Sequence, residues 1–451
     1  MSDGPDTIAA LASGAGRAGV AVIRVSGPAV PAIARALLGR LPSPRRAVVA
    51  AFAGADGRAL DRGVALYFPA PASFTGEHVL ELQGHGSPVL VDRLLARLLE
   101  LGARLAEPGE FSRRAFLNDK LSLDQAEAIA DAIDAGSSAA ASAAMRSLEG
   151  VFAREIEALR SALIELRVYT EAAIDFPDED DVDFLGDGEI AGRLADIRRR
   201  LAALIDRARE GARLREGLRL VILGAPNVGK SSLLNRLARR DTAIVTEIAG
   251  TTRDVLHEQL AIDGLPLTLV DTAGLRETDD PIEAEGVRRA RAELAQADRV
   301  LLVVDDSRGP GPDDHCLLEE IGDRCPVSVI ANKIDLSGAA AGETRLAGRE
   351  AVRLSATTGA GLDALAAHLR RAAGLAGDSE PDFVARRRHL EALARADAAL
   401  DRGHDRLVVD AAGELLAEEL RVAQAALGEI TGAFTSEDLL GAIFSSFCIG
   451  K

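Results

Sequence analysis

The feature that most constrains this 451-residue chain is a short glycine-rich segment in its middle. The segment Gly224-Ala-Pro-Asn-Val-Gly-Lys-Ser231 follows the apolar run LRLVIL and precedes the helical pattern SSLLNRLARR. Strand, glycine-rich loop and helix in this order let backbone N–H groups cradle phosphates at a positive helix end. The lysine of such a loop contacts the β and γ phosphates, and the next hydroxyl binds Mg²⁺. The pattern therefore predicts a nucleoside triphosphate site at Lys230 and Ser231.

Three motifs downstream predict which nucleotide is bound. Asp271-Thr-Ala-Gly274 ends a second apolar run, where its aspartate can hold Mg²⁺ through water and its glycine N–H can sense the γ-phosphate. Asn332-Lys-Ile-Asp335 ends another run, and its aspartate can accept both N1–H and the exocyclic amine of guanine, a pair that adenine does not donate. Backbone donors of Ser355-Ala-Thr357 complete the base pocket. The motifs and their order predict a GTPase.

The predicted nucleotide contacts come from these motifs and from the segment between the first two. They are Asn227, Val228, Gly229, Lys230, Ser231, Ser232, Thr246, Thr252, Asp271, Gly274, Asn332, Lys333, Asp335, Ser355, Ala356 and Thr357.

The catalytic group is less directly predicted. Ras-type GTPases orient the attacking water with a glutamine, but that position here is Leu275. The segment 246–254 offers hydroxyl and carbonyl oxygens that can hold a monovalent cation, with a further ligand from Asn227, and Thr252 is the expected switch ligand to Mg²⁺. Glu283, twelve residues past Asp271, can orient water, although the pattern alone favours a solvated surface carboxylate at this position.

The composition sets the broad class. The chain is 47% apolar and 27% charged, which is typical of a globular protein, and its length indicates about three domains. No apolar run is long enough to span a bilayer, so we expect a cytoplasmic protein without a membrane partner. A net charge of −17 opposes nonspecific attraction to nucleic acid, so any such contact must be local. Three scattered cysteines favour neither disulfides nor a structural metal site.

The pattern along the chain predicts four segments. Residues 217–376 alternate short apolar runs with helical patterns, as in a mostly parallel sheet covered by helices. Residues 120–216 and 377–451 are largely helical, and they can form one helical domain into which the GTPase domain is inserted. Residues 1–119 are mixed, with strands in GVAVIRVSG and HVLELQGHG and an amphipathic helix over residues 91–105. The acidic segment 175–189 is expected to be a solvated loop between helices.

Further motifs lie outside the GTPase segment: SFTGE, LELQGHG, FLNDKL followed by QAEAI, and the terminal FCIGK. Together with GAPNVGKSSLLN, TEIAGTTRD, DTAGLRE and NKID, they make a chain that resembles the MnmE (TrmE) family of tRNA uridine-modifying GTPases over nearly its whole length. The resemblance implies a multidomain α/β fold: an N-terminal α/β folate-binding and dimerisation domain (1–119), a discontinuous helical domain (120–216 and 377–451) and an inserted Ras-like P-loop GTPase domain (217–376).

The resemblance also implies an activity. With an FAD-dependent partner protein, in a heterotetramer built on a homodimer, the family adds an aminomethyl or carboxymethylaminomethyl group to carbon 5 of the wobble uridine of certain tRNAs. The one-carbon unit comes from tetrahydrofolate, in its 5-formyl or methylene form. Hydrolysis of GTP, with Mg²⁺ and stimulated by K⁺, drives the cycle.

The resemblance assigns residues to these ligands by motif. Glu283 and Lys230 are the implied catalytic residues. The implied K⁺ ligands are Asn227, Thr246, Ile248 and Thr251, and the implied Mg²⁺ ligands are Ser231 and Thr252. The implied folate contacts are Arg24, Glu81, Lys120 and Lys451, which include two of only four lysines in the chain.

Three interpretations stay open at this point. Cys448 is either a nucleophile in one-carbon chemistry or a small residue packed in a C-terminal turn. His85 is either a pocket residue or a structural residue in a glycine-flanked turn. The alternative function is that of a GTPase switch in ribosome assembly, for which a basic RNA-binding appendage would be expected.

The apolar tail containing Phe444, Phe447 and Ile449 is expected to dock on the protein.

Overall fold

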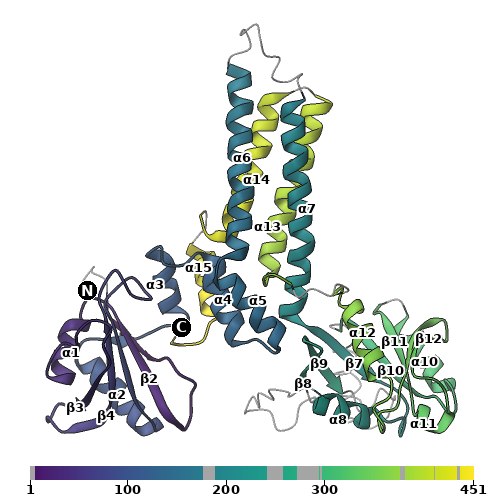
Figure 1. Ribbon diagram of the computed structural model, residues 1–451, viewed down its shortest axis with the longest axis horizontal. Coiled ribbons are helices and arrows are strands. Elements are labelled where there is room, and N and C mark those ends of the chain that lie inside the picture. The colour runs from purple at the N-terminus through teal and green to yellow at the C-terminus, as the bar shows by residue number, and fades with distance from the viewer. Residues whose placement is uncertain are drawn as a thin grey trace. The chain divides into compact units, whose positions relative to one another are not determined.

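The computed structural model describes residues 6–175, 188–240, 257–271, 294, 297–322, 324–375, 381–410, 412–433 and 437–450. The chain divides into two compact units. The first consists of Met1–Ala130, Leu148–Ile190 and Ala399–Lys451, and the second of Asp131–Ser147 and Ala191–Ala398. Each unit combines one β-sheet with helices, and Figure 1 colours them by residue number. The predicted boundaries at 119, 216 and 376 stay predictions.

The sheet of the first unit has six strands in the order β3-β4-β5-β2-β1-β6. The strands are β1 (Ile8–Leu11), β2 (Ala18–Ser26), β3 (Val48–Ala53), β4 (Ala59–Phe68), β5 (Val79–Gly86) and β6 (Arg104–Leu105). Neighbouring strands are antiparallel except β1 and β6, which run parallel. The predicted strands GVAVIRVSG and HVLELQGHG are confirmed as β2 and β5, and they pair with each other.

Alternation along these strands sends every second side chain into one core. Ile23 and Val25 of β2 and Leu80 and Leu82 of β5 are buried in the same cluster, which also contains residues of helices α1 (Val30–Leu38) and α2 (Pro88–Glu100). The intervening residues, Arg24 and Glu81 among them, are therefore placed on the opposite face of the sheet. That face carries the candidate site described below.

The predicted helix over residues 91–105 is wrong at its C-terminal end. Helix α2 stops at Glu100, because the backbone turns at Gly102, whose φ of 96° is accessible to glycine without strain. Arg104 and Leu105 then pair with Ile8 and Ala9 as β6. The helical spacing of apolar residues continues past the turn in the sequence. In the structure, however, the last residues of the segment form a strand beside β1 and are not part of the helix.

The helices of the first unit include the long pair α6 (Val151–Asp175) and α14 (Gly413–Thr431), which lie side by side in Figure 1. Arg167 of α6 donates to the Gln424 side chain of α14 at 3.0 Å. The shorter helices are α3 (Glu110–Leu117) and α15 (Glu437–Ser445), with most of α4 (Leu123–Ile133). The acidic segment predicted as a loop lies between α6 and α7 (Glu189–Glu216), and its residues 176–187 are outside the described part of the chain.

The sheet of the second unit has seven strands in the order β12-β13-β11-β10-β7-β9-β8. They are β7 (Leu218–Leu223), β8 (His257–Ile262), β9 (Leu265–Asp271), β10 (Arg299–Asp305), β11 (Val327–Asn332), β12 (Gly342–Leu346) and β13 (Arg349–Arg353). The five central strands are parallel, and β8 and β12 are antiparallel edges. The prediction of a mostly parallel sheet is thus confirmed. The edge strands β8 and β12 were not predicted from the sequence.

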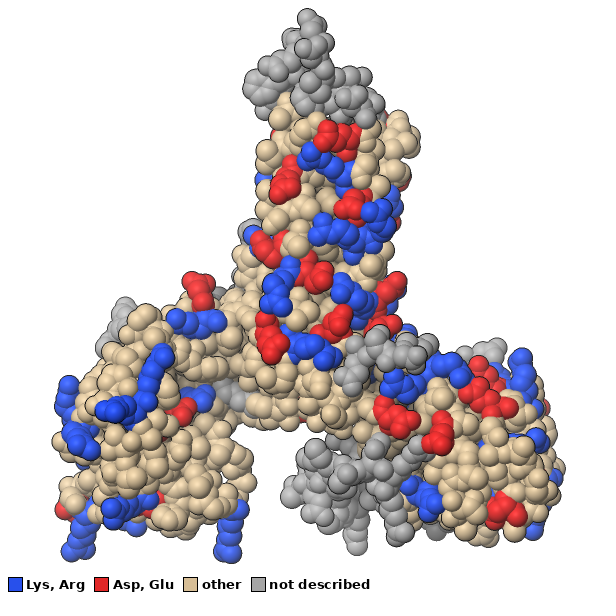
Figure 2. All heavy atoms as spheres, in the orientation of Figure 1, with Lys and Arg blue, Asp and Glu red and all other residues tan. Residues whose placement is uncertain are grey.

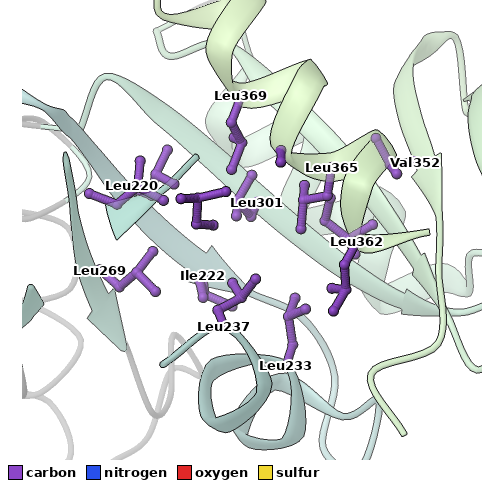
Figure 3. Close-up of a cluster of buried hydrophobic side chains, with 14 of the residues drawn as sticks. Leu220, Ile222, Leu233, Leu237, Leu269, Leu301, Val352, Leu362, Leu365 and Leu369 are labelled. Atoms are coloured by element: carbon purple, nitrogen blue, oxygen red, sulfur yellow. The ribbon is translucent and has the colours of Figure 1, made fainter. Parts of the chain in front are cut away.

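The central strands read as continuous apolar runs because both of their faces are covered. Leu220 and Ile222 of β7 point into the cluster in Figure 3, while Val221 and Leu223 belong to a cluster on the other face. Helix α8 (Lys230–Arg240) contributes Leu233 and Leu237 to the first cluster, and helix α12 (Leu362–Ala372) contributes three leucines. This packing fixes the helix that begins directly after the glycine-rich loop. Helices α10 (Pro312–Ile321) and the short α11 (Ile334–Ser337) also belong to this unit.

Also in the second unit, one buried carboxylate joins the two chain segments that flank the seven-stranded sheet. Asp131 accepts hydrogen bonds from Arg215, near the end of α7, and from Arg386, just before α13 (Arg387–Val408), each at 2.7 Å. Its side chain is 6% exposed. Arg146 of α5 (Ser138–Leu148) donates to the carbonyls of Pro381 and Asp382. These contacts hold the chain segments before and after the sheet close to each other.

The surface mixes charges of both signs. Basic and acidic side chains are interspersed over each unit on the face shown in Figure 2. Many form ion pairs, such as Arg402 with Glu419 at 2.8 Å and Arg421 with Glu418 at 2.7 Å. Among the described residues, no helix is long and apolar enough to cross a membrane, and no group of three or more His, Cys, Asp or Glu side chains is placed to hold a metal ion.

Candidate functional site

The glycine-rich loop joins the end of β7 to the start of α8, as predicted. Gly224 has φ of 145°, and a Cβ there would lie 2.2 Å from the Val303 carbonyl oxygen. Gly229 has φ of 100°, and its Cβ would lie 2.3 Å from Nδ2 of Asn332. Both positions therefore require glycine for conformation and for space. The loop is held against β10 and β11, with its backbone leading into the positive end of α8.

The polar side chains of the loop lie where the motif predicts them. Lys230 Nζ donates to the carbonyls of Gly224 at 2.7 Å and Ala225 at 3.0 Å, so the ammonium lies over the loop. Ser231 and Ser232 are exposed in the first turn of α8. The ammonium and the first-turn hydroxyl are thus both at the phosphate-binding end of the helix.

Asn332 connects this loop to the base-binding loop. Its Nδ2 donates to the Val228 carbonyl at 2.9 Å, and its Oδ1 accepts from the Ala356 amide at 2.9 Å. The residue is only 2% exposed. Ser355 is fully buried, and its hydroxyl accepts from the amide of Thr358 at 3.1 Å, which closes the loop after β13. One buried amide side chain therefore fixes the phosphate loop and the base loop relative to each other.

The other residues of the guanine motif surround this bridge. Lys333 adopts φ of 70°, and its Nζ contacts Asp305 Oδ2 at 2.8 Å. Burial raises the pKa of Asp305, but hydrogen bonds from Lys333 and Ser307 lower it by more, so the carboxyl titrates below its ordinary 3.8. Asp335 in α11 is exposed, as is required of a carboxylate that receives a base from solvent. Thr357 is exposed beside the buried Ala356.

Several predicted residues lie outside the described part of the chain. They are Thr246, Ile248, Thr251, Thr252, Gly274, Leu275, Glu283 and Lys451. Asp271 is described as the last residue of β9, at the same edge of the sheet as the glycine-rich loop, because β9 runs parallel to β7.

In the first unit, the structure brings together two of the predicted folate contacts. Arg24 and Glu81 are direct partners across β2 and β5, and Arg24 Nε and Nη2 both donate to Glu81 Oε1, at 3.0 and 2.9 Å. The guanidinium carbon lies 5.1 Å from the centre of the Phe74 ring and 5.8 Å from that of Phe111. Aromatic faces stabilise a cation in this position. Within the described residues, Oε2 of Glu81 has no hydrogen-bond partner.

Lys120 approaches this region through the loop of residues 73–77. Gly76 has φ of 79°, and a Cβ there would lie 2.9 Å from Cβ of Asn118 and 3.2 Å from Cε of Lys120. Asn118 also donates to the Thr75 carbonyl at 2.7 Å. Lys120 therefore packs beside the loop that carries Phe74. It also lines a cavity of about 540 Å³ between residues 116–125 and 431–433.

Sequence reasoning missed the ion network that supports this loop. Arg114 of α3 contacts Glu77 at 3.1 Å and Glu110 at 2.8 Å, and Arg104 contacts Glu110 at 2.6 Å. Asp6 pairs with both arginines. The i, i+4 spacing of Glu110 and Arg114 was the one signal available from sequence, because the other members are far apart in the chain.

The C-terminal tail docks in the first unit, which confirms that prediction. Phe444 and Phe447 are buried with Leu123 of α4, and the Gly109 amide donates to the Cys448 carbonyl at 3.3 Å. A Cβ on Gly450 would lie 2.1 Å from the Leu11 carbonyl oxygen, so the tail passes directly against β1. Ile449 pairs through its backbone with Pro108 while its side chain is 61% exposed. The Cys448 side chain is exposed as well.

A glycine-rich phosphate loop before α8, a parallel central sheet and an asparagine that bridges to the base loop define a P-loop GTPase domain, here inserted in a protein with its own second sheet. Comparison with known families refines this class. A model described as "GTP-binding protein TrmE N-terminus" matches residues 7–120, and one described as "MnmE helical domain" matches residues 123–448. The second match encloses the GTPase domain, which agrees with a helical domain in two segments.

Curated relatives match over their full length. The protein named tRNA modification GTPase MnmE is 59% identical in Alkalilimnicola ehrlichii over 445 residues, 56% in Pseudomonas syringae over 452 residues and 55% in Yersinia pestis over 451 residues. In each case 99% of both chains is covered. The chain belongs to the MnmE family of tRNA modification GTPases. Family membership favours tRNA modification over the alternative of a ribosome-assembly switch.

Proposed function

We propose that the chain hydrolyses GTP in order to drive modification of tRNA. It adds an aminomethyl or carboxymethylaminomethyl group to carbon 5 of the wobble uridine of certain tRNAs, together with an FAD-dependent partner. It acts as a homodimer in the cytoplasm and draws a one-carbon unit from tetrahydrofolate. Family membership supports the reaction class, and the finer assignments rest on the residues discussed next.

The observation that carries the nucleotide assignment is the Asn332 bridge between the phosphate and base loops. It supports assigning Asp335 to guanine and Lys230 to the β and γ phosphates, because Asn332 joins the loop that carries Lys230 to the loop that completes the base pocket. Ser231 and Thr252 are the proposed Mg²⁺ ligands, and Mg²⁺ neutralises charge on the phosphates when bound. Asn227, with φ of 65°, presents its side chain at the exposed tip of the loop and is a proposed K⁺ ligand. The remaining K⁺ ligands are Thr246, Ile248 and Thr251.

The first experiment tests the hydrolysis mechanism. With Leu275 in the position of the usual glutamine, we expect turnover to require K⁺ and to fall at least tenfold when Na⁺ replaces it at equal ionic strength. Glu283→Gln should lower turnover and leave GTP affinity nearly unchanged, because the assigned role is confined to the transition state. Equal rates in the two salts, or a loss of affinity with normal turnover, would contradict these roles.

The residues near Arg24 fit a reduced folate. The Glu81 oxygen that does not accept from Arg24 can accept N–H groups of a pterin, and the side chain is 18% exposed. Lys120 and Lys451 supply ammonium groups for the glutamate carboxylates. The folate supplies the one-carbon unit when bound. Docking of the tail against β1 supports a site completed by the last residue of the chain.

The second experiment tests the folate site. Deletion of residues 447–451 should abolish binding of 5-formyltetrahydrofolate in calorimetric titration and abolish tRNA modification, while GTP hydrolysis persists. Glu81→Gln is the milder variant. It keeps the size of the side chain but removes the negative charge, and it replaces one of the two oxygens that could accept pterin N–H groups with an NH₂ donor. Folate affinity that survives in both variants would remove Glu81 and Lys451 from the site.

A further inference from the structure

The glycine-flanked histidine of β5 forms an ordered pair with a buried carboxylate. Asp61 Oδ1 accepts from Nδ1 of His85 at 2.7 Å, and Asp61 Oδ2 accepts from the His85 backbone amide at 2.8 Å. The amide of Arg62 donates to the same carboxylate at 2.7 Å. The Asp61 side chain is 8% exposed, whereas that of His85 is 68% exposed. A buried anion thus holds an exposed imidazole in one orientation.

The hydrogen bonds of Asp61 determine which nitrogen of the His85 ring carries the proton and which carries a free lone pair. Burial raises the pKa of Asp61, but the bonds from the His85 side chain and from the two amides lower it by more, so the carboxyl is ionised and only accepts. The proton shared with Asp61 must therefore be on Nδ1. In the neutral ring, Nε2 then carries a lone pair. Nε2 has no hydrogen-bond partner among the described residues.

The backbone is shaped to admit this carboxylate. A Cβ on Gly84 would lie 2.4 Å from Asp61 Oδ2, although Gly84 does not adopt a left-handed conformation. Glycine is therefore required at this position for space and not for backbone freedom. The neighbouring Gly63 allows an equally close approach, because its Cβ would lie 2.0 Å from the Gln83 carbonyl oxygen.

A purely structural histidine is placed differently in this protein. His368 is 4% exposed, and its Nε2 bonds the buried Ser328 hydroxyl at 2.6 Å. The amide of His85 already ties β5 to Asp61, so the strand contact does not need the ring. The carboxylate that holds the ring is on the core side of the sheet, because Asp61 is opposite the buried Phe52 across β3 and β4, and a Cβ on Gly84 would lie 3.5 Å from the Phe52 ring. At about 3.4 Å per residue, His85 lies about 14 Å along the strand from Glu81.

We propose that His85, oriented by Asp61, is a proton-transfer residue of the modification reaction, an assignment that rests on the function proposed above. Nε2 accepts the proton of a substrate N–H or O–H group as that bond breaks. The negative charge of Asp61 balances the imidazolium, and the proton then passes from Nε2 to water. An orienting carboxylate behind Nδ1 and a free Nε2 are the arrangement this chemistry needs.

The experiment compares His85→Asn with His315→Asn in the full chain, with tRNA and the FAD-dependent partner. The asparagine introduced in the first variant keeps an N–H donor for Asp61 but cannot carry a proton, and His315 is an exposed histidine of the other unit. We expect kcat of modification to fall about 100-fold or more in the first variant with KM nearly unchanged, and imidazole in the buffer to restore part of it for His85→Gly. The second variant should be normal, and GTP hydrolysis should be normal in all.

A readout independent of activity tests the orientation. Nitrogen-15 NMR of labelled histidine should show the Nδ1–H tautomer for His85, and Asp61→Asn should shift that population. Normal kcat in His85→Asn, or a change in KM alone, would overturn the proposal and leave the proposed function intact. An unmutated protein that does not modify tRNA would overturn both.

Discussion

Replacing Asn332 by alanine should weaken GTP binding, because it removes the side chain that joins the phosphate loop to the base loop. The substitution removes two buried hydrogen bonds of 2.9 Å and leaves the Val228 carbonyl and the Ala356 amide without partners. Each unsatisfied buried group costs about 1–3 kcal/mol. After partial relaxation, the substitution should therefore destabilise the nucleotide-binding arrangement of the two loops by about 2–4 kcal/mol. At 1.4 kcal/mol per factor of ten, GTP affinity should fall roughly 30-fold to several hundredfold.

The assay is calorimetric or fluorescence titration with a non-hydrolysable GTP analogue. Asn235→Ala is the matched control, because Asn235 is exposed on α8 and should change affinity less than twofold. Asn332→Asp is the sharper variant: it retains an acceptor for Ala356 but sets a carboxylate oxygen against the Val228 carbonyl, so it should bind no better than the alanine variant. Affinity within twofold of the unmutated protein for either Asn332 variant would refute the bridging role.

Three further outcomes are expected. Asp131→Asn should lower the unfolding free energy by about 3 kcal/mol, because two arginines lose a buried anion, while the exposed Asp134→Asn should be nearly neutral in the same denaturant titration. Asp335→Asn should weaken GTP binding and improve binding of xanthosine triphosphate, whose carbonyl replaces the exocyclic amine, as a competition assay would show. Burial raises the pKa of Asp6 and Glu110, but hydrogen bonds from arginine lower both by more. Their stabilising contribution is present above pH 4.5 and is lost as the pH falls through the lowered values, so circular dichroism should show acid unfolding that begins below pH 4.5.

The nucleotide loop could be predicted because its information is local. Strand, glycine-rich loop and helix are contiguous in the sequence, and the required glycines at 224 and 229 mark the turn. The central strands were predicted for a similar reason, since strands covered on both faces are continuous apolar runs. The edge strands β8 and β12 lack such runs and were missed. Helix α2 was predicted too long because helical spacing extended into residues that pair with β1.

Contacts between distant residues could not be predicted from pattern alone. The family resemblance named Arg24 and Glu81, but their mutual ion pair depends on the register between β2 and β5. The network around Arg114 likewise joins residues from three segments, and no periodicity relates them. His85 was visible in its motif, but Asp61 was not identified as its partner.

The sequence alone determined which chemical groups are available: a phosphate loop, a guanine motif and, through the resemblance, a family. Local backbone preferences and apolar periodicity are sufficient for that, because they act over a few residues. Only the tertiary structure decided which groups meet. Asn332 reaches Val228 and Ala356, and Asp61 reaches His85, because strand register and the absence of a glycine Cβ bring their backbones within hydrogen-bonding distance. Such contacts depend on the packing of the whole sheet, which no short segment specifies.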